Sequence, residues 1–167
     1  MSGPSSRSSL ARRAATVADL KLELVLIPVS DVDRAKAFYT EKLGFVLDVD
    51  HQPSETFRVV QMTPPGSACS ITVGIGITDA EPGSYRGTHL VVWDIEAARE
   101  ELVARGVEVS DVRHFDREAG EWRPGADPDH GPYASFADFA DPDGNTWVLQ
   151  EVRKEPADAI GAPAETA

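Results

Sequence analysis

The sequence predicts an α+β fold of two tandem βαβββ modules whose strands form a curved mixed sheet, with the helices on its outer face. The main observation is a repeat. An apolar strand runs into an aspartate-led helix that ends at a glycine, once from Asp31 to Gly44 and again from Asp94 to Gly106. Aspartate caps a helix N-terminus, and glycine suits the left-handed position after the last turn. Three strand candidates follow each helix, and one such module alone leaves a sheet face unburied.

The first module is predicted to occupy residues 21–83. Its strand, helix and three further strands are expected at Leu22–Val29, 30–44, Phe45–His51, Phe57–Met62 and Ala68–Ile77. Cys69, the one cysteine of the sequence, falls in the last of these strands, where a small core residue is the expected role. A single cysteine permits neither an internal disulfide nor a thiolate metal cluster.

The second module is predicted to occupy residues 84–153. Its elements are expected at Thr88–Val92, 94–106, Val107–Val112, Ser135–Ala140 and Thr146–Val152. The segment 113–133 lies between the strand candidates Val107–Val112 and Ser135–Ala140. It is rich in glycine, proline and aspartate and is predicted to be a long loop. It is either a surface loop held by an aromatic anchor or a lid over a binding site, with Trp122 or Tyr133 stacking on a flat ligand.

Composition limits the class of partner. The 167 residues suit one compact domain or two small modules, and the formal net charge of −12 disfavours nucleic acid and anionic membranes while leaving a cationic ligand possible. No segment approaches transmembrane length, so we expect a cytoplasmic protein. Residues 1–20 and 154–167 are expected to be flexible tails, with a short helix considered at Leu10–Leu20.

Three stretches carry a resemblance to a known family. They are VSDVDRAKAFYTEKLGF at 29–45, THLVVWDIEAAREELVARGV at 88–107 and DPDGNTWVLQE at 141–151. Together with the paired βαβββ pattern, they resemble the vicinal oxygen chelate superfamily over about residues 21–153. This superfamily includes glyoxalase I, extradiol dioxygenases, and fosfomycin and bleomycin resistance proteins. The resemblance implies a cup formed by paired sheets, but it does not fix an activity, because the scaffold supports unrelated chemistry.

The resemblance also implies four positions where metal-dependent members carry His, Gln or Glu. In this sequence those positions hold Leu24, Thr72, Gly87 and Val148. None of these side chains is a carboxylate or an imidazole, so no metal is predicted and no cofactor is expected; a divalent metal is the alternative. A two-residue shift of register would place His89 at the third position.

The remaining candidates follow from strand alternation and residue chemistry. Ligand contacts are expected from cup-facing and loop residues: Leu24, Arg58, Thr72, His89, Trp122, Tyr133, Val148 and Gln150. His89 is either a hydrogen-bonded wall residue, a ligand contact or a general base. Arg58 either clamps a ligand carboxylate or extends to water. Trp93 and Trp147 are expected under helices on the outer face.

Two further arrangements stay open as metal sites. Glu151 should face away from the cup unless the last strand is bulged, in which case it becomes a ligand candidate. His114, Asp116 and His130 could assemble a site within the loop, although their spacing follows no helical or tight-turn pattern.

Three function classes therefore compete. The first is a metal-independent protein that binds a small organic molecule, aromatic or cationic. The second is a lyase, isomerase or dioxygenase with displaced active-site residues. The third is a structural or regulatory module whose cup is filled by its own side chains. The resemblance implies a homodimer, although a chain with two modules could also complete its own cup as a monomer.

Overall fold

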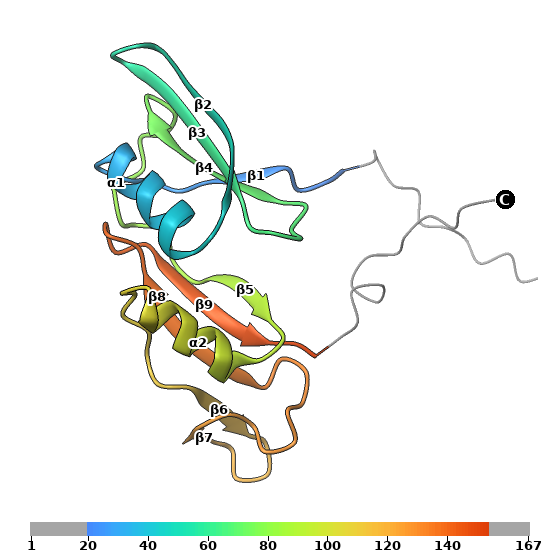
Figure 1. The fold of residues 1–167 in the computed structure, drawn as a ribbon. Coiled ribbons are helices and arrows are strands. Elements are labelled where there is room, and N and C mark those ends of the chain that lie inside the picture. The colour runs from blue at the N-terminus through green and yellow to red at the C-terminus, as the bar shows by residue number, and fades with distance from the viewer. Residues whose placement is uncertain (1–19, 154–167) are drawn as a thin grey trace, which may run out of the picture.

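The computed structural model describes residues 20–153 (Figure 1). The tails expected at 1–20 and 154–167, and the helix considered at Leu10–Leu20, lie outside this range apart from Leu20. Two modules of one helix and several strands follow one another, so the predicted α+β fold class is confirmed. In the described part of the chain, the strands form two hydrogen-bonded sheets, one for each module.

Sheet one contains the four strands of the first module in the order β1-β4-β3-β2. Their bounds are Leu24–Leu26 for β1, Val46–Ser54 for β2, Phe57–Thr63 for β3 and Ser70–Ile75 for β4. β1 runs parallel to β4, and the other pairs are antiparallel. The first strand is shorter than the predicted Leu22–Val29, and Pro28 near its end has no amide hydrogen to donate.

Sheet two repeats this order with one strand added at its edge: β5-β9-β8-β6-β7. The bounds are Thr88–Val92 for β5, Arg113–Asp116 for β6, Glu121–Pro124 for β7, Ser135–Ala140 for β8 and Thr146–Glu151 for β9. β5 is parallel to β9, as β1 is to β4. The internal repeat predicted from the sequence is therefore present in the strand order.

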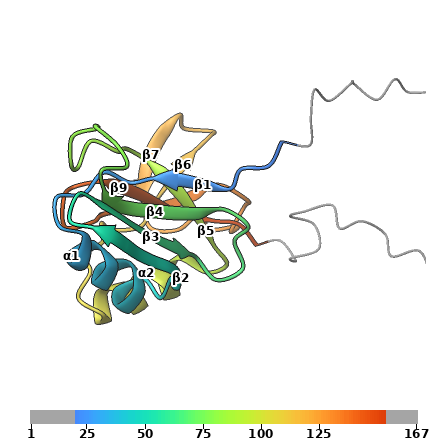
Figure 2. The ribbon, with the colours of Figure 1, turned by 90° about the horizontal axis from the view of Figure 1, so that it is seen from above.

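Aspartate caps start both helices, as predicted. Asp31 accepts a hydrogen bond from the backbone amide three residues on before α1 (Val32–Ala37), and Asp94 does the same before α2 (Ile95–Ala104). α1 continues into a π-helical turn, η1 (Phe38–Lys42). Both helices lie on the same side of the sheets (Figure 2). Among residues 20–153, no helix is long and apolar enough to cross a membrane.

An aromatic core joins the two modules on the helix side. Tyr39 of the first module and Trp147 of the second are almost completely buried, and the indole Nε1 donates to the Tyr39 hydroxyl at 3.1 Å. The rings of Phe139 and Trp147 stack with centroids 6.3 Å apart. The expected burial of Trp147 is confirmed. The expectation for Trp93 is wrong: it is 54% exposed, because β5 ends before it and the chain turns directly into α2.

Two element predictions in the second module are corrected by the structure. Val107–Val112 is not a strand; of its residues only Val109 forms a bridge, to Phe139. The Arg99 guanidinium donates to the carbonyls of Val109 and Ser110, so these oxygens do not continue a strand ladder. The segment 113–133 is not a single loop, because it contains the hairpin of β6 and β7.

Candidate functional site

Each sheet has one face toward the helices and one face turned away from them, which we call the open face. In β4, Ile71 and Val73 belong to the core on the helix side. Thr72 alternates with them and therefore lies on the open face. Leu24 and Leu26 pair with open-face positions of β4 and remain 37% and 38% exposed. The open face of sheet one therefore presents leucine side chains at its edge.

The open face of sheet two carries the predicted residues of the last strand. Trp147 and Leu149 are buried on the helix side, so Val148 and Gln150 lie on the open face. His89 pairs with Val148 in the parallel ladder and shares its face. The facing that strand alternation predicts for these three residues is thus confirmed.

A chain of hydrogen bonds sets the orientation of His89. The Tyr133 carbonyl can only accept, and it receives the side-chain amide of Gln150 at 3.3 Å. The Gln150 Oε1 atom is therefore left to face His89 Nδ1, at 3.0 Å. In this arrangement Nδ1 carries the proton and donates, so Nε2 of the neutral ring is an acceptor with a free lone pair. Tyr133 thus contributes through its backbone.

An aromatic cluster covers the outer strands of the same open face. Trp122 contacts Phe115 and Phe136 edge-on, with ring centroids 5.4 and 5.5 Å away. The Arg113 guanidinium lies 5.1 Å from the Trp122 ring centroid and forms an ion pair with Asp138. Trp122 is nevertheless 53% exposed. A half-exposed indole held on three sides can accept a flat ligand on its free surface.

Sequence reasoning missed four members of this cluster: Arg113, Phe115, Phe136 and Asp138. The signal was present in β8, where alternate residues of Ser135–Ala140 differ in polarity and size. For β6 the sequence offers no strand signal, because the segment 113–133 is rich in glycine, proline and aspartate. Once β6 is paired with β8, Arg113 falls beside Phe136 on the open face.

The four positions implied for a metal offer no ligand set. Leu24, Thr72 and Val148 lie on the open faces, and Gly87 precedes β5 with φ of 72°. The Thr72 hydroxyl is buried without a hydrogen-bond partner, but a lone hydroxyl is a poor site for a divalent cation. Among residues 20–153, no three His, Cys, Asp or Glu side chains are placed to hold a metal ion.

Arg58 does not join the other predicted site residues. It has the alternation of Val60, a core residue, and therefore lies on the helix side. Its guanidinium donates to Asp50 at 2.9 and 3.0 Å and to Asp33 of α1 at 2.8 Å. Hydrogen bonds from Arg58 and then from Lys36 hold the pKa of Asp50 well below its usual range. Arg58 therefore fastens α1 to sheet one.

Because of this pairing, we expect Arg58→Met to lower the free energy of unfolding by an amount that depends on pH. Because the pKa of Asp50 is lowered in the folded state, its pairing stabilises the protein above the unfolded-state pKa of about 4 and loses that contribution as the pH falls further. We expect a loss of about 1 kcal/mol at pH ~7 that shrinks below pH ~4. Urea unfolding at about pH 7 and about pH 3 measures this difference in stability, with Lys21→Met as a charge-matched control. A constant difference at both pH values would contradict the assignment.

The alternative metal residues are held apart by their own partners. Glu151 is fully buried on the helix side, so it faces away from the open face as expected from alternation. His130 Nδ1 lies 2.8 Å from Glu151, whereas His114 Nδ1 lies 2.8 Å from the Gly125 carbonyl. Asp116 pairs with an arginine, and backbone hydrogen bonds, chiefly from Ala119, lower its pKa. The metal site considered for His114, Asp116 and His130 is therefore not assembled.

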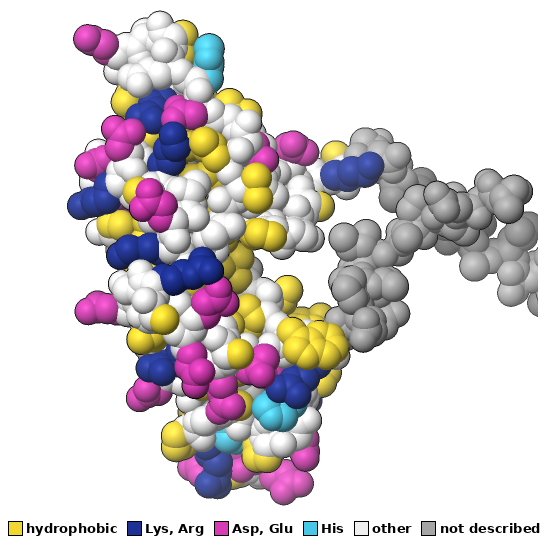
Figure 3. Space-filling view, in the orientation of Figure 1, with side chains coloured by type: hydrophobic (Ala, Val, Ile, Leu, Met, Phe, Trp, Pro, Cys, Tyr) yellow, Lys and Arg dark blue, Asp and Glu magenta, His cyan; other side chains and the backbone are white. Residues whose placement is uncertain are grey.

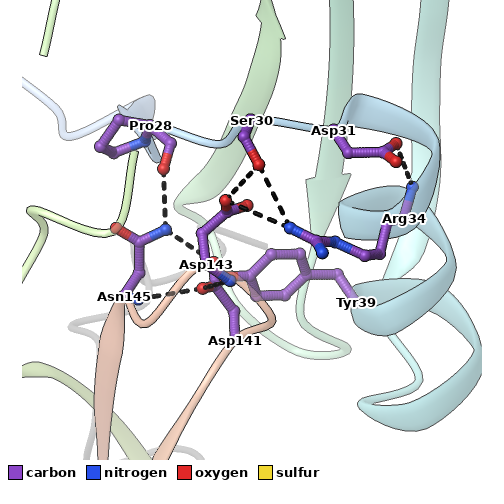
Figure 4. A network of polar contacts seen from close by, with 8 residues as sticks. All are labelled: Pro28, Ser30, Asp31, Arg34, Tyr39, Asp141, Asp143 and Asn145. Atoms are coloured by element: carbon purple, nitrogen blue, oxygen red, sulfur yellow. Dashed lines mark hydrogen bonds and ion pairs between the residues drawn. The ribbon is translucent and has the colours of Figure 1, made fainter. Parts of the chain in front are cut away.

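The DPDGN turn that precedes β9 fastens the two modules together (Figure 4). The buried carboxylate of Asp141 accepts from the Tyr39 hydroxyl at 2.8 Å and from the Asn145 side chain at 2.7 Å. Asn145 also donates to the Pro28 carbonyl at 2.8 Å. Burial, and then the Asp141 charge, raise the pKa of Tyr39 well above its usual range. This motif therefore has a structural role.

Comparison with known proteins agrees with this architecture. The family model "Glyoxalase/Bleomycin resistance protein/Dioxygenase superfamily" matches residues 21–149. The chain belongs to this superfamily. The resemblance inferred from the three sequence stretches is thus confirmed. A curated relative, the protein YetH of Bacillus subtilis (strain 168), is 28% identical over 130 residues, which is 76% of this chain and 94% of the relative.

Solved structures of superfamily members show the same fold. The antibiotic binding protein TnmS3 from Streptomyces sp. CB03234 is 33% identical, with a TM-score of 0.64 over 82% of this chain and 99% of its own. A glyoxalase/bleomycin resistance protein from the same organism is 34% identical, with a TM-score of 0.59 over 78% and 99%. A superfamily member from Sphaerobacter thermophilus is 30% identical, with a TM-score of 0.61 over 79% and 97%.

Proposed function

We propose that this superfamily member binds a small, flat organic molecule on its open faces without a metal. The observation that carries the proposal is the half-exposed indole of Trp122, held by Phe115 and Phe136 and by the guanidinium of Arg113. Such an arrangement leaves a rigid aromatic surface available for stacking. The free Nε2 of His89 offers an acceptor on the same sheet face for an O–H or N–H of the ligand.

Two lines of support concern the chemistry of the site. The positions that carry metal ligands in metal-dependent members hold Leu24, Thr72, Gly87 and Val148 here, so binding by stacking and hydrogen bonds replaces coordination. One similar structure is described as an antibiotic binding protein. We therefore take aromatic and cationic antibiotics as the first ligand class to test; the net charge of −12 suits a cationic ligand.

A thermal-shift screen of cationic antibiotics and aromatic metabolites tests the proposal, followed by titration of each hit. We expect Trp122→Ala to weaken binding of a hit by about 10-fold or more, because the variant loses both the apolar contact and the ring stacking of the indole, together about 1–3 kcal/mol. Val103→Ala is the matched control, since Val103 is an exposed apolar residue of α2 on the helix side. No hit in the screen, or equal affinity in both variants, would contradict the proposal.

The open faces also support a proposal about assembly. Leu24, Leu26, Val46, Val49 and Phe57 are exposed on sheet one, although apolar side chains are costly to leave in water. We propose that a second copy of the chain covers these faces and that the binding cup is completed in a homodimer. Sedimentation at micromolar concentration distinguishes a dimer from a monomer that leaves its open faces in solvent.

The hydrogen-bonded His89 favours a metal-free enzyme as the second candidate. An imidazole whose Nδ1 is held by Gln150 can use Nε2 as a general base toward an acidic C–H or O–H. We expect elemental analysis of gently purified protein to find no stoichiometric divalent metal. About one metal per chain that is lost in His89→Ala would instead support metal-dependent chemistry with displaced ligands.

A further inference from the structure

A hollow of about 910 Å³ lies between the β6–β7 hairpin and the segment 127–134. Its lining combines prolines and other apolar groups with charged and histidine side chains, among them His114, Asp116, Glu118, Arg123, Asp127 and Asp129. Acidic, basic and histidine side chains gather at the lower end of the molecule in Figure 3, over β6 and β7. Trp122 does not line this hollow, and His114 alternates with the open-face residue Arg113 and so lies on the other face. Phe115 of the aromatic cluster borders the hollow, which therefore adjoins the proposed ligand face.

The geometry fixes the hydrogen-bonding role of His114. Only 8% of this residue is exposed, and its Nδ1 lies 2.8 Å from the Gly125 carbonyl oxygen. A carbonyl oxygen can only accept, so Nδ1 carries the hydrogen and Nε2 of the neutral ring is an acceptor. Nε2 has no hydrogen-bond partner among residues 20–153 and is not enclosed by protein atoms. It is therefore an oriented acceptor in an otherwise buried ring that lines the hollow.

The charges around the hollow favour a cation. Asp116 is neutralised by Arg123, whose Nε lies 2.8 Å from its carboxylate. The Asp127 carboxylate accepts the Gly131 backbone amide at 2.7 Å. Neither Asp127 nor Asp129 forms an ion pair within the described residues. Arg117 lines the hollow as the remaining cation. Glu118 also lines the hollow without an ion pair among residues 20–153. Three unpaired carboxylates and an imidazole lone pair together match a ligand that carries positive charge and N–H donors.

We infer that this hollow is a second binding site, which takes a small organic cation with N–H donors such as a primary ammonium or guanidinium compound. The ligand donates one N–H to His114 Nε2 and another to the Asp127 carboxylate. A quaternary ammonium ion lacks the N–H that His114 requires, and an anion is repelled by the carboxylates. The inference does not depend on the proposed function of the open faces.

Spermidine is the probe. Its fully N-methylated quaternary derivative is the control cation, since it has the same three charges and no N–H, and succinate is the control anion. We expect saturable spermidine binding that shifts the ¹⁵N resonance of His114 Nε2, and at least tenfold weaker binding of the quaternary derivative and of succinate. Spermidine and its quaternary derivative binding with equal affinity would overturn the inference in favour of general attraction to an acidic protein.

Three variants distinguish the loss of the His114 Nε2 acceptor from a loss of folding stability. His114→Asn keeps an N–H donor near the Nδ1 position for the Gly125 carbonyl but removes the Nε2 acceptor, and we expect it to weaken spermidine binding at least tenfold. Asp127→Asn keeps an acceptor for the loop amide while removing the charge, with a similar expected loss. Glu108→Gln removes one charge outside the hollow and should bind as the wild type does. Unchanged affinity in His114→Asn, with its melting temperature retained, would overturn the site.

Discussion

Asp141→Ala should lower the free energy of unfolding by about 3 kcal/mol, because several buried donors lose their acceptor at once. One carboxylate oxygen accepts from the Tyr39 hydroxyl and the Asn145 side chain, and the other accepts from the backbone amides of Asp143 and Asn145. Alanine leaves these groups buried without a partner. Urea unfolding at neutral pH measures the loss, with an unchanged slope showing that the folded state is still compact.

Asp79→Ala is the control for this prediction, since Asp79 is an exposed aspartate outside the network, and its effect should stay within about 0.5 kcal/mol. Asp141→Asn, which keeps one acceptor oxygen, should fall between the two. If Asp141→Ala were no less stable than Asp79→Ala, the turn would not be what holds the modules together. Tyr39 lies on η1 of the first module, and Asp141 precedes β9 of the second module. Asp141→Ala therefore weakens the contact between the two modules.

The repeated parts of the fold were predictable because local chemistry and long-range packing favour the same structure there. Asp31 and Asp94 cap helices in isolation as well as in the protein, and Gly44 and Gly106 adopt a positive φ that disfavours other residues. The strand Ser135–Ala140 was predicted with its bounds as observed. Agreement between these levels is what made the superfamily recognisable from sequence.

The β6–β7 hairpin was not predictable for the opposite reason. Its strands Arg113–Asp116 and Glu121–Pro124 are short and contain Asp, Glu and Pro, which are poor strand formers. The hairpin is stabilised by contacts with distant β8, above all that of Trp122 with Phe136. Such cross-strand contacts leave no signal within the segment itself, so the cluster around Trp122 could be located only in three dimensions.

The sheet face of the candidate residues was predictable where strand alternation alone decides it. His89, Val148 and Gln150 lie on the open face as expected. For Arg58 alternation does not decide the role, because its partners lie on other elements: Asp33 on α1 and Asp50 on β2. A lone arginine in a strand shows no sign of such partners in its neighbourhood, and its role as a ligand clamp was therefore an open alternative.

Glu151→Ala should cost about 2–4 kcal/mol of stability, since it removes a fully buried carboxylate with three partners. One oxygen accepts from the Ile95 amide at 3.1 Å at the start of α2, and the other lies 2.8 Å from His130 Nδ1 and 3.5 Å from Arg153 Nε. A carboxylate at this end of a helix also interacts favourably with its dipole. Urea unfolding measures the loss, and faster hydrogen exchange at the Ile95 amide locates it.

Glu100→Ala is the control, because Glu100 is an exposed carboxylate within α2. This variant should change stability by less than about 0.5 kcal/mol. Gln150→Ala completes the comparison, because Gln150 is the neighbour of Glu151 on the opposite sheet face. It should leave stability nearly unchanged but release His89 from its fixed tautomer, so it should weaken any open-face ligand that donates to His89 Nε2. If Glu151→Ala were the variant that altered ligand contacts while remaining stable, the assignment of the two faces would be reversed.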